Sequence, residues 1–268
     1  MNEKDLADLH AAVRLLENPS LGVKVADVIG TPIERAIALL PARATALIGT
    51  ATEKAILGAL RLSLRTIDPR EPDSGAEPAE SSNRWHRAAT AATGALGGAF
   101  GLLALTIELP ISTTIMMRSI ADVARSEGAD LRDVQTQLEC VQILAFGAPP
   151  TSDDGADVGY FFAREAMAKT VSEAAAHIAK SGLGKEAAPA IVRLTTKIAE
   201  RFSINVTEKA AAQVVPIIGA VGGIVINTIF IDHFQNVARG HFALRRLERT
   251  YGQEVVRRKY LEFKDAKD

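Results

Sequence analysis

Two uncharged apolar stretches, each carrying several glycines, constrain this chain more than any other feature. Residues 88–107 and 210–231 contain no Asp, Glu, Lys or Arg, although 24% of the chain is charged. The same short pattern occurs in both, as GALGG in the first and GAVGG in the second. Each stretch is long enough for about five to six helical turns. Either a protein core or a bilayer must therefore cover them.

The glycines predict how these two helices meet. Glycine inside a helix costs about 1 kcal/mol relative to alanine, so several together need an offsetting gain. Close approach of two helix backbones is the usual gain. We therefore expect the two stretches to pack on each other. The glycines of this contact are Gly94, Gly97, Gly98, Gly101, Gly219, Gly222 and Gly223.

The remainder of the chain also has the pattern of helices. Hydrophobic residues make up 47% of the sequence but aromatic residues only 5%, a core composition that favours helix. Apolar residues recur at helical spacing and no clear strand pattern is present, with residues 204–207 as the only short candidate. The predicted fold class is all-α, a multi-helix bundle around the two close-packed glycine-rich apolar helices.

Prolines and polar residues mark the predicted breaks. Glu108 and Pro110 interrupt the first apolar helix, which resumes and stops at Gly128. Residues 68–84 are rich in Pro, Ser and charge, which is typical of a flexible loop or linker. We expect an N-terminal helical segment at 1–67, this linker, and a helical core domain at 85–268. A long basic helix, running to about residue 263, follows the second apolar stretch.

Two environments fit the apolar stretches. Alanine, glycine and threonine contribute little to membrane insertion, and Gln213, Pro216 and Asn227 oppose it in the second stretch. Burial in a water-soluble core is therefore favoured over insertion, which stays the alternative.

Polar residues that share helical stripes with apolar ones form the candidate site. Asn227 and His241 lie on the stripe of Phe230 and Phe234, and a mixed stripe continues after the first apolar helix. Because similar segments precede both stripes, we expect the two sets to lie near each other. The cluster contains Glu108, Arg118, Asp122, Asn227, Asp232, His233 and His241.

This cluster has two interpretations. A buried ionic network would fix the register of the bundle. Alternatively, carboxylates and histidines could bind a divalent metal or carry acid–base chemistry. No spacing matches a known metal motif, so we favour the network and expect no cofactor, with a divalent metal as the alternative. The single cysteine, Cys140, is interpreted as a small buried side chain.

The C-terminal region is locally basic. Residues 239–259 hold seven Arg or Lys against two Glu, a composition that suits anionic headgroups or a solvated helix face. With a net charge of −1 and no recognition motif, nucleic acid is not expected. The lipid-contact candidates are Arg239, Arg245, Arg246, Arg249, Arg257 and Arg258.

Most of the chain from about residue 85 to 255 resembles the bacterial EcsC protein family. Its most specific parts are ELPISTTIMMRSIA, which begins at Glu108, and GAVGGIVINTIFIDHFQNVARGHFALRRLE, which begins at Gly219. The resemblance implies importance for the polar cluster and adds Arg245 to it. It implies no catalytic residue, because no reaction is assigned to the family. The family name derives from a protein encoded beside an ABC transporter, which implies a link to transport or to an envelope process.

We therefore expect a membrane-associated accessory or interaction protein. Its partner would be a membrane surface or a membrane protein. The start of the chain lacks the pattern of a secretory signal, so the expected location is the cytoplasm, at the inner face of the cell membrane. The alternative is a metal-dependent hydrolase that uses the carboxylate–histidine cluster on a lipid or peptide. A purely soluble interaction module is a third hypothesis.

Overall fold

The computed structural model describes residues 1–17, 20–65, 102–147, 159–182, 188–215 and 219–266. These residues form helices and short connections, with no strand among them, so the predicted all-α class is confirmed. The helices are α1 (Glu3–Leu16), α2 (Leu21–Ile29), α3 (Ile33–Ala38), α4 (Ala44–Arg65), α6 (Leu102–Ser126), α7 (Val134–Gln142), the short 3₁₀ turn η1 (Ile143–Ala145), α8 (Tyr160–Ser181), α9 (Pro189–Val214), α10 (Gly219–Tyr251) and α11 (Gln253–Asp265).

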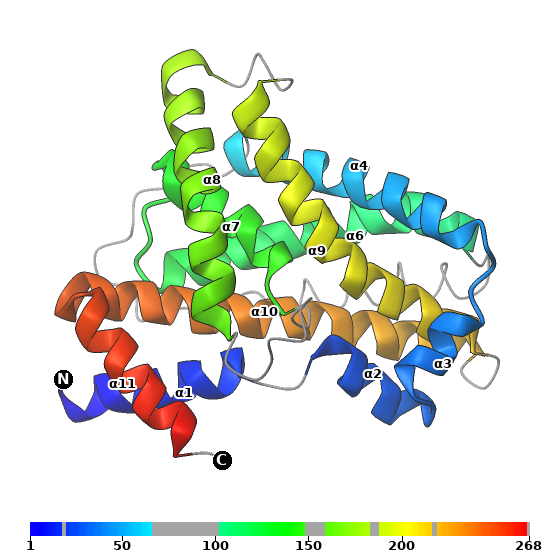
Figure 1. Ribbon diagram of the computed structural model, residues 1–268, viewed down its shortest axis with the longest axis horizontal. Coiled ribbons are helices and arrows are strands. Elements are labelled where there is room, and N and C mark those ends of the chain that lie inside the picture. Colours follow the sequence, from blue (N-terminus) through cyan, green and yellow to red (C-terminus); the bar gives the residue numbers. More distant parts are fainter. Residues whose placement is uncertain (18–19, 66–101, 148–158, 183–187, 216–218, 267–268) are drawn as a thin grey trace.

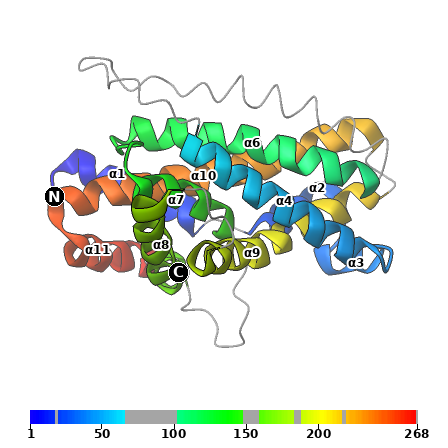
Figure 2. The same cartoon turned by 90° about the horizontal axis from the view of Figure 1, so that it is seen from above.

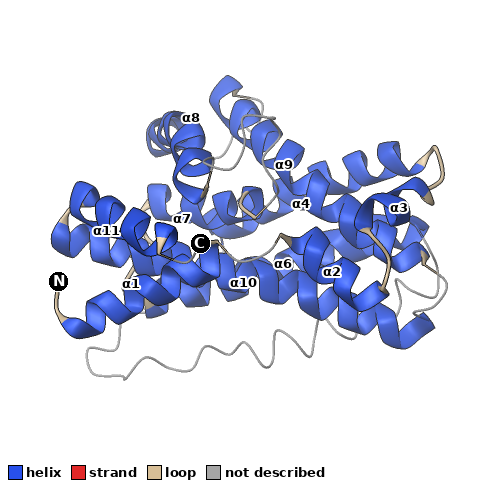
Figure 3. Cartoon of the chain, turned by 60° about the horizontal axis from the view of Figure 1, so that its bottom comes forward, coloured by secondary structure: helices blue, strands red, loops and turns tan. Residues whose placement is uncertain are grey.

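The 33-residue helix α10 is the backbone of the bundle (Figure 1). Helix α6 lies beside it and runs in the same direction, while α4 packs on α6 (Figures 1 and 2). Helix α9 packs against both α4 and α10. The N-terminal helix α1 lies along one end of α10 together with α11, and α2 contacts α10 farther along (Figure 3). The N-terminal helices thus pack on the same bundle as the rest of the chain.

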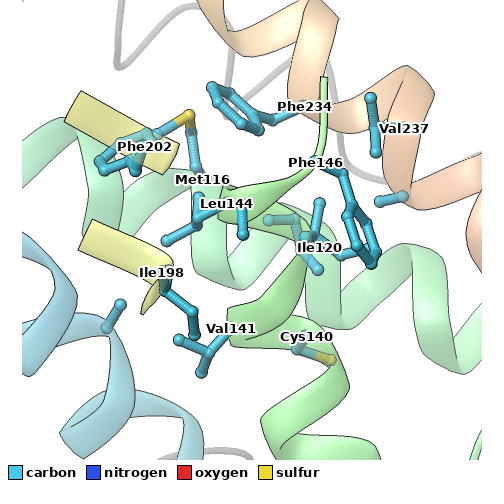
Figure 4. Close-up of a cluster of buried hydrophobic side chains, with 14 of the residues drawn as sticks. Met116, Ile120, Cys140, Val141, Leu144, Phe146, Ile198, Phe202, Phe234 and Val237 are labelled. Carbon is cyan, nitrogen blue, oxygen red and sulfur yellow. The ribbon is translucent and has the colours of Figure 1, made fainter. Parts of the chain in front are cut away.

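The core is centred on α7 and the 3₁₀ turn that follows it. Every residue from Leu138 to Phe146 is buried, although α7 is short. Figure 4 shows their apolar side chains between those of α6, α9 and α10. Cys140 is one of them; it is fully buried, and burial raises the pKa of its thiol well above its usual range. The interpretation of Cys140 as a packing residue is therefore confirmed.

Two predicted breaks are wrong. Helix α6 continues through Pro110, because packing against α4 and α10 outweighs the hydrogen bond that proline removes. Helix α9 continues through residues 204–207, so the candidate strand is helix. Buried Asn205 and Val206 follow Phe202 at helical spacing, and tertiary packing thereby overrides the β propensity of Val and Thr.

Two predicted helices are also divided differently. The second apolar stretch, 210–231, is not one helix, because α9 ends at Val214 and α10 begins at Gly219. The long basic helix ends at Tyr251, since Gly252 takes a φ of 85° that a continuing helix cannot accommodate. Residues 88–101 lie outside the described residues, so the predicted packing of Gly94, Gly97, Gly98 and Gly101 on α10 stays a prediction. The predicted linker lies outside them too. Of the glycines that were predicted to pack against these four, Gly223 lies buried within α10.

A glycine that the motif analysis passed over sets the contact between α1 and α10. A Cβ at Gly240 would fall 2.6 Å from Leu16 Cγ and 3.2 Å from the carbonyl oxygen of Ala12. Both distances are below ordinary van der Waals contact. The α1 backbone can therefore approach α10 this closely only because residue 240 has no side chain.

We expect Gly240→Ala to lower the free energy of unfolding by about 1–3 kcal/mol, because α1 must move away from α10. The matched control is Gly58→Ala in α4, where nothing lies within 4 Å of the added methyl group. That change is expected to raise stability by about 0.5–1 kcal/mol. Urea denaturation of both variants measures the difference. Equal stability of Gly240→Ala and the wild type would contradict close contact.

Candidate functional site

The structure distributes the predicted polar cluster over separate places instead of gathering it in one. One group lies where α6, α9 and α10 meet, and a second lies where α7, α8 and α10 meet. A third lies between α2 and α10. Each group is best described by the contacts of its own side chains.

The first group is a buried ion pair. Lys209 Nζ of α9 donates to Glu108 Oε1 of α6 at 2.6 Å and to Asn227 Oδ1 of α10 at 2.8 Å. The ammonium also lies 4.6 Å from the ring centroid of Phe230, within cation–π range. Lys209 and Asn227 are fully buried, and Glu108 is 5% exposed. Three helices are thus joined through one ammonium group.

Lys209 was absent from the predicted cluster, although the sequence contains a signal for it. Leu194, Ile198 and Phe202 are buried along one stripe of α9. Continuing that stripe in steps of three and four reaches Asn205 and then Lys209. A lysine on an apolar stripe predicts a buried partner of opposite charge. Because Glu208 directly precedes Lys209, the two residues together have the pattern of an exposed, charged helix face.

The second group is an extended ionic network. His241 Nδ1 and the Tyr160 hydroxyl are 2.7 Å apart, which ties α10 to the first turn of α8. Arg245 of α10 donates to both carboxylate oxygens of Glu139 at 3.1 and 2.9 Å, and also to Glu248 at 3.2 Å. The network holds three helices together by charge-assisted hydrogen bonds.

A second arginine completes this network from α8. Arg164 forms a bidentate pair with Glu248, with both N···O distances 2.7 Å. Each carboxylate in the network therefore faces a guanidinium group. Burial alone would raise the pKa of Glu139, but His241 and Arg245 lower it to about 2. Burial lowers the pKa of His241, which favours the neutral imidazole.

The third group surrounds His233. This side chain is 4% exposed, and neither ring nitrogen has a hydrogen-bond partner among the described residues. The ring lies against Gly147, where φ is +78° and a Cβ would collide with His233 Nε2. Burial and the nearby Lys24 ammonium together lower the pKa of His233 to about 3. The charge of Lys24 also interacts with that of Asp232.

Glu208 of α9 lies at the start of α2. Its carboxylate accepts a hydrogen bond from the backbone of Gly22, where a Cβ would fall 2.6 Å from Glu208 Oε1. The N-cap residue Ser20 makes no side-chain capping bond, so Glu208 supplies the acceptor for this turn. Burial raises the pKa of Glu208 to about 7, with a smaller contribution from the charge of Glu34 and against the effect of the Gly22 hydrogen bond.

Two predicted members lie apart from these groups. Arg118 is exposed on α6. Asp122, one turn later, forms an ion pair with Arg125 at 3.2 Å. Neither position joins the buried networks described above. Of the eight predicted residues, the structure therefore connects Glu108 with Asn227 and His241 with Arg245, through partners from other helices.

Five of the six lipid-contact candidates have partners within the protein. Arg246 donates to Asp5 at 3.1 Å, to Asp8 at 2.7 Å and to Glu127 at 2.9 Å, which fastens α1 and the end of α6 to α10. Arg249 donates to the carbonyl oxygen of Glu127 at 2.9 Å. Three further pairs are Arg245 with Glu139, Arg239 with Asn236 and Arg257 with Glu165. Arg258 is exposed.

Exposed aliphatic side chains are concentrated at the opposite end of α10. Ile107 and Ile111 of α6 are 69% and 45% exposed, and Ile224 and Val225 of α10 are 37% and 38% exposed. Helices α6 and α10 run side by side in the same direction (Figure 2). Because Ile107 and Ile111 lie near the start of α6, and Ile224 and Val225 near the start of α10, all four lie towards the same end of the bundle. We call them the apolar end: Ile107, Ile111, Ile224 and Val225. Exposed aliphatics also occur at Val28 of α2, at Ile37 of α3 and at Leu39, which follows α3.

Two further properties bear on the predicted alternatives. Within the described ranges, no three His, Cys, Asp or Glu side chains come together in a way that could hold a metal ion. Among the same residues, no helix combines the length and the apolar character that crossing a bilayer requires.

The fold and its buried networks define an all-α helical bundle held together by interhelical ion pairs. The chain matches the model of the EcsC protein family over residues 17–247, well over half of its length. It belongs to the EcsC protein family. Neither the curated proteins nor the solved structures with which the chain was compared include a match.

Removing the buried ammonium tests the first group. We expect Lys209→Met to lower the free energy of unfolding by about 3–5 kcal/mol, because Glu108 is left as a buried, uncompensated charge. Adding Glu108→Leu should restore most of this loss, since an apolar pair can replace a buried ion pair at little cost. Urea denaturation of both single variants and the double variant measures the coupling. Additive effects in the double variant would contradict a direct pair.

A pH dependence follows from Glu208. Its pKa rises from 4.5 to about 7 on folding, so between these values the folded state retains a proton that the unfolded state has released. Stability should therefore fall as the pH rises through this window, by about 2–3 kcal/mol in total. Glu208→Gln keeps an acceptor for Gly22 and should remove this loss, so its advantage over the wild type should grow from pH 5 to pH 8.

The difference between variant and wild type isolates Glu208 from the histidines. The lowered pKa of His233 acts in the opposite direction, because its contribution to stability is lost as the pH falls below about 6.5. That contribution is common to both proteins and cancels in the comparison. Parallel stability curves for Glu208→Gln and the wild type would refute the assignment.

Proposed function

We propose that this protein is a membrane-associated accessory or interaction protein that seats its apolar end in the surface of a membrane, at the inner face of the cell membrane. The observation that carries the proposal is the exposure of Ile107, Ile111, Ile224 and Val225 on neighbouring helices. Exposed aliphatic side chains that gather at one end of a helical bundle can mark a site of protein or membrane contact.

The charge distribution of α6 and α10 supports this proposal. From Leu105 to Met117 the only charged residue is Glu108, and its carboxylate is buried against Lys209. The segment of α10 from Gly223 to Ile231 contains no charged residue. The exposed surface of both helices is therefore uncharged at this end, and no charged group has to be dehydrated when it enters the interface.

Arg118 has a defined place in this arrangement. It follows Ile111 by seven residues on α6, which corresponds to about 10 Å along the helix axis. Interfacial segments bury their apolar face about 5–10 Å deep, so the guanidinium would lie at the level of the headgroups. An exposed arginine at that depth can bind phosphate oxygens while its aliphatic part stays near the apolar layer.

This proposal replaces docking through the basic helix as the mode of attachment. Arg245 and Arg246 are engaged with carboxylates of α7, α1 and the end of α6. Turning these arginines towards lipid would break ion pairs that join the helices. No comparable observation favours the metal-dependent hydrolase, because Glu108, His233 and His241 have separate surroundings.

Liposome flotation of the full chain tests the proposal. We expect the double variant Ile107→Glu/Ile224→Glu to bind at least tenfold less protein to vesicles of mixed zwitterionic and anionic lipids, because burial of one such side chain contributes about 1.5–3 kcal/mol. Raising the salt concentration should change wild-type binding little, since apolar contact is not screened.

The matched control is Leu261→Glu on α11, because Leu261 is an exposed aliphatic residue, 43% exposed, at the other end of the bundle. It should bind as the wild type does. If wild-type protein remains unbound at all lipid compositions, or if the control loses as much binding as the double variant, the apolar end is not the attachment site.

A further inference from the structure

Helices α4 and α9 enclose a groove that none of the networks above uses. Its volume is about 560 Å³, within the range of small-molecule sites. The two helices lie side by side across the bundle (Figure 1). Along α9 the lining extends from Val192 to Ser203, about 16 Å at the helical rise. The lining residues are Gly49, Thr52, Glu53, Ile56, Leu57, Val192, Thr195, Thr196, Ala199, Glu200 and Ser203.

One buried hydroxyl in this groove has no partner. Thr52 is 1% exposed, and its Oγ1 forms no hydrogen bond with any described residue. Other hydroxyls of the lining bond to the preceding helical turn: Thr195 to the carbonyl oxygens of Ile191 and Val192, and Ser203 to that of Glu200. A buried polar group without a partner is destabilising, so the Thr52 hydroxyl needs an explanation. A ligand group in the groove would supply the missing hydrogen bond.

The charges of the groove have one sign. Glu53 and Glu200 are exposed members of the lining, and no Lys, Arg or His belongs to it. Among the described residues, neither carboxylate takes part in an ion pair with a basic side chain. Their combined field favours a cation next to the Thr52 hydroxyl. Ile56, Leu57 and Ala199 provide an apolar surface beside it.

We propose that this groove binds a primary aliphatic ammonium ion. The ammonium group lies between Glu53 and Glu200 and donates one N–H to the Thr52 hydroxyl. The alkyl chain extends along Ile56, Leu57 and Val192. A quaternary ammonium lacks the N–H that Thr52 requires, and a carboxylate is repelled by both glutamates. The groove is formed by α4 and α9, so this proposal does not depend on the apolar end.

Isothermal titration calorimetry with decylammonium, below its micelle concentration, tests the ligand class. We expect decylammonium to bind the full chain at least tenfold more tightly than decanoate, decan-1-ol or decyltrimethylammonium. The methyl resonance of Ile56 in isotope-labelled protein should shift on titration with decylammonium. A matching shift with decanoate, or equal affinity for the four compounds, would overturn the proposal. Equal affinity is also the result expected if the groove accepts only a helix of a partner protein.

Variants assign the recognition to individual groups. Glu53→Gln/Glu200→Gln should weaken decylammonium binding at least fivefold, whereas Glu254→Gln, which removes an exposed carboxylate of α11, should leave it unchanged. Thr52→Val should weaken binding severalfold without loss of thermal stability, because it removes a hydroxyl that has no partner in the free protein. If both groove variants bind as the wild type does, the ligand is held elsewhere and the assignment fails.

Two variants with opposite expected outcomes separate this site from the membrane proposal. Ile107→Glu/Ile224→Glu should retain full affinity for decylammonium while it loses liposome binding. Ala199→Trp should fill the groove and abolish decylammonium binding while liposome binding persists. Loss of decylammonium binding in Ile107→Glu/Ile224→Glu would place the ammonium ion at the apolar end and overturn the groove site.

Discussion

The contact between Lys209 and Glu108 is the interaction on which the arrangement of α6, α9 and α10 depends. A lysine ammonium transferred alone into a protein core is very costly, so Lys209 can be buried only where Glu108 and Asn227 meet it at hydrogen-bond distance. That requirement fixes the register of the three helices relative to one another. It also keeps the one charge of this part of α6 inside the protein, which leaves the apolar end with an uncharged surface.

The two ends of α10 therefore differ in chemistry. Towards its C-terminus, Arg245 and Arg246 connect α10 to α1, α6 and α7 through carboxylates. Towards its N-terminus, aliphatic side chains are exposed and the polar groups are buried. This separation supports a molecule that is held together at one end and makes contact at the other. The groove between α4 and α9 belongs to neither end, and its carboxylates and Thr52 give it a recognition chemistry of its own.

Much of the fold follows from local patterns in the sequence, and its interruptions do not. Helical spacing identifies most helices, but it places breaks at Pro110 and near residues 204–207, where the chain continues as helix. Packing on neighbouring helices outweighs the local preference at both places, and a single sequence contains no direct measure of that packing. The lack of charge in residues 210–231 likewise does not show that α9 ends and α10 begins within this stretch, although Pro216 lies between the two helices.

The sequence by itself determined that the chain is all-α and that polar residues such as Glu108, Asn227 and His241 lie on apolar stripes, because helical periodicity is a local property. The sequence also carried the family membership, since its motifs are contiguous. Only the tertiary structure decided the partners: Lys209 for Glu108, Tyr160 for His241 and acidic residues for the basic helix. Ion pairs between helices join residues far apart in the chain. Periodicity shows which face of a helix is buried, but not which side chain of another helix meets it there.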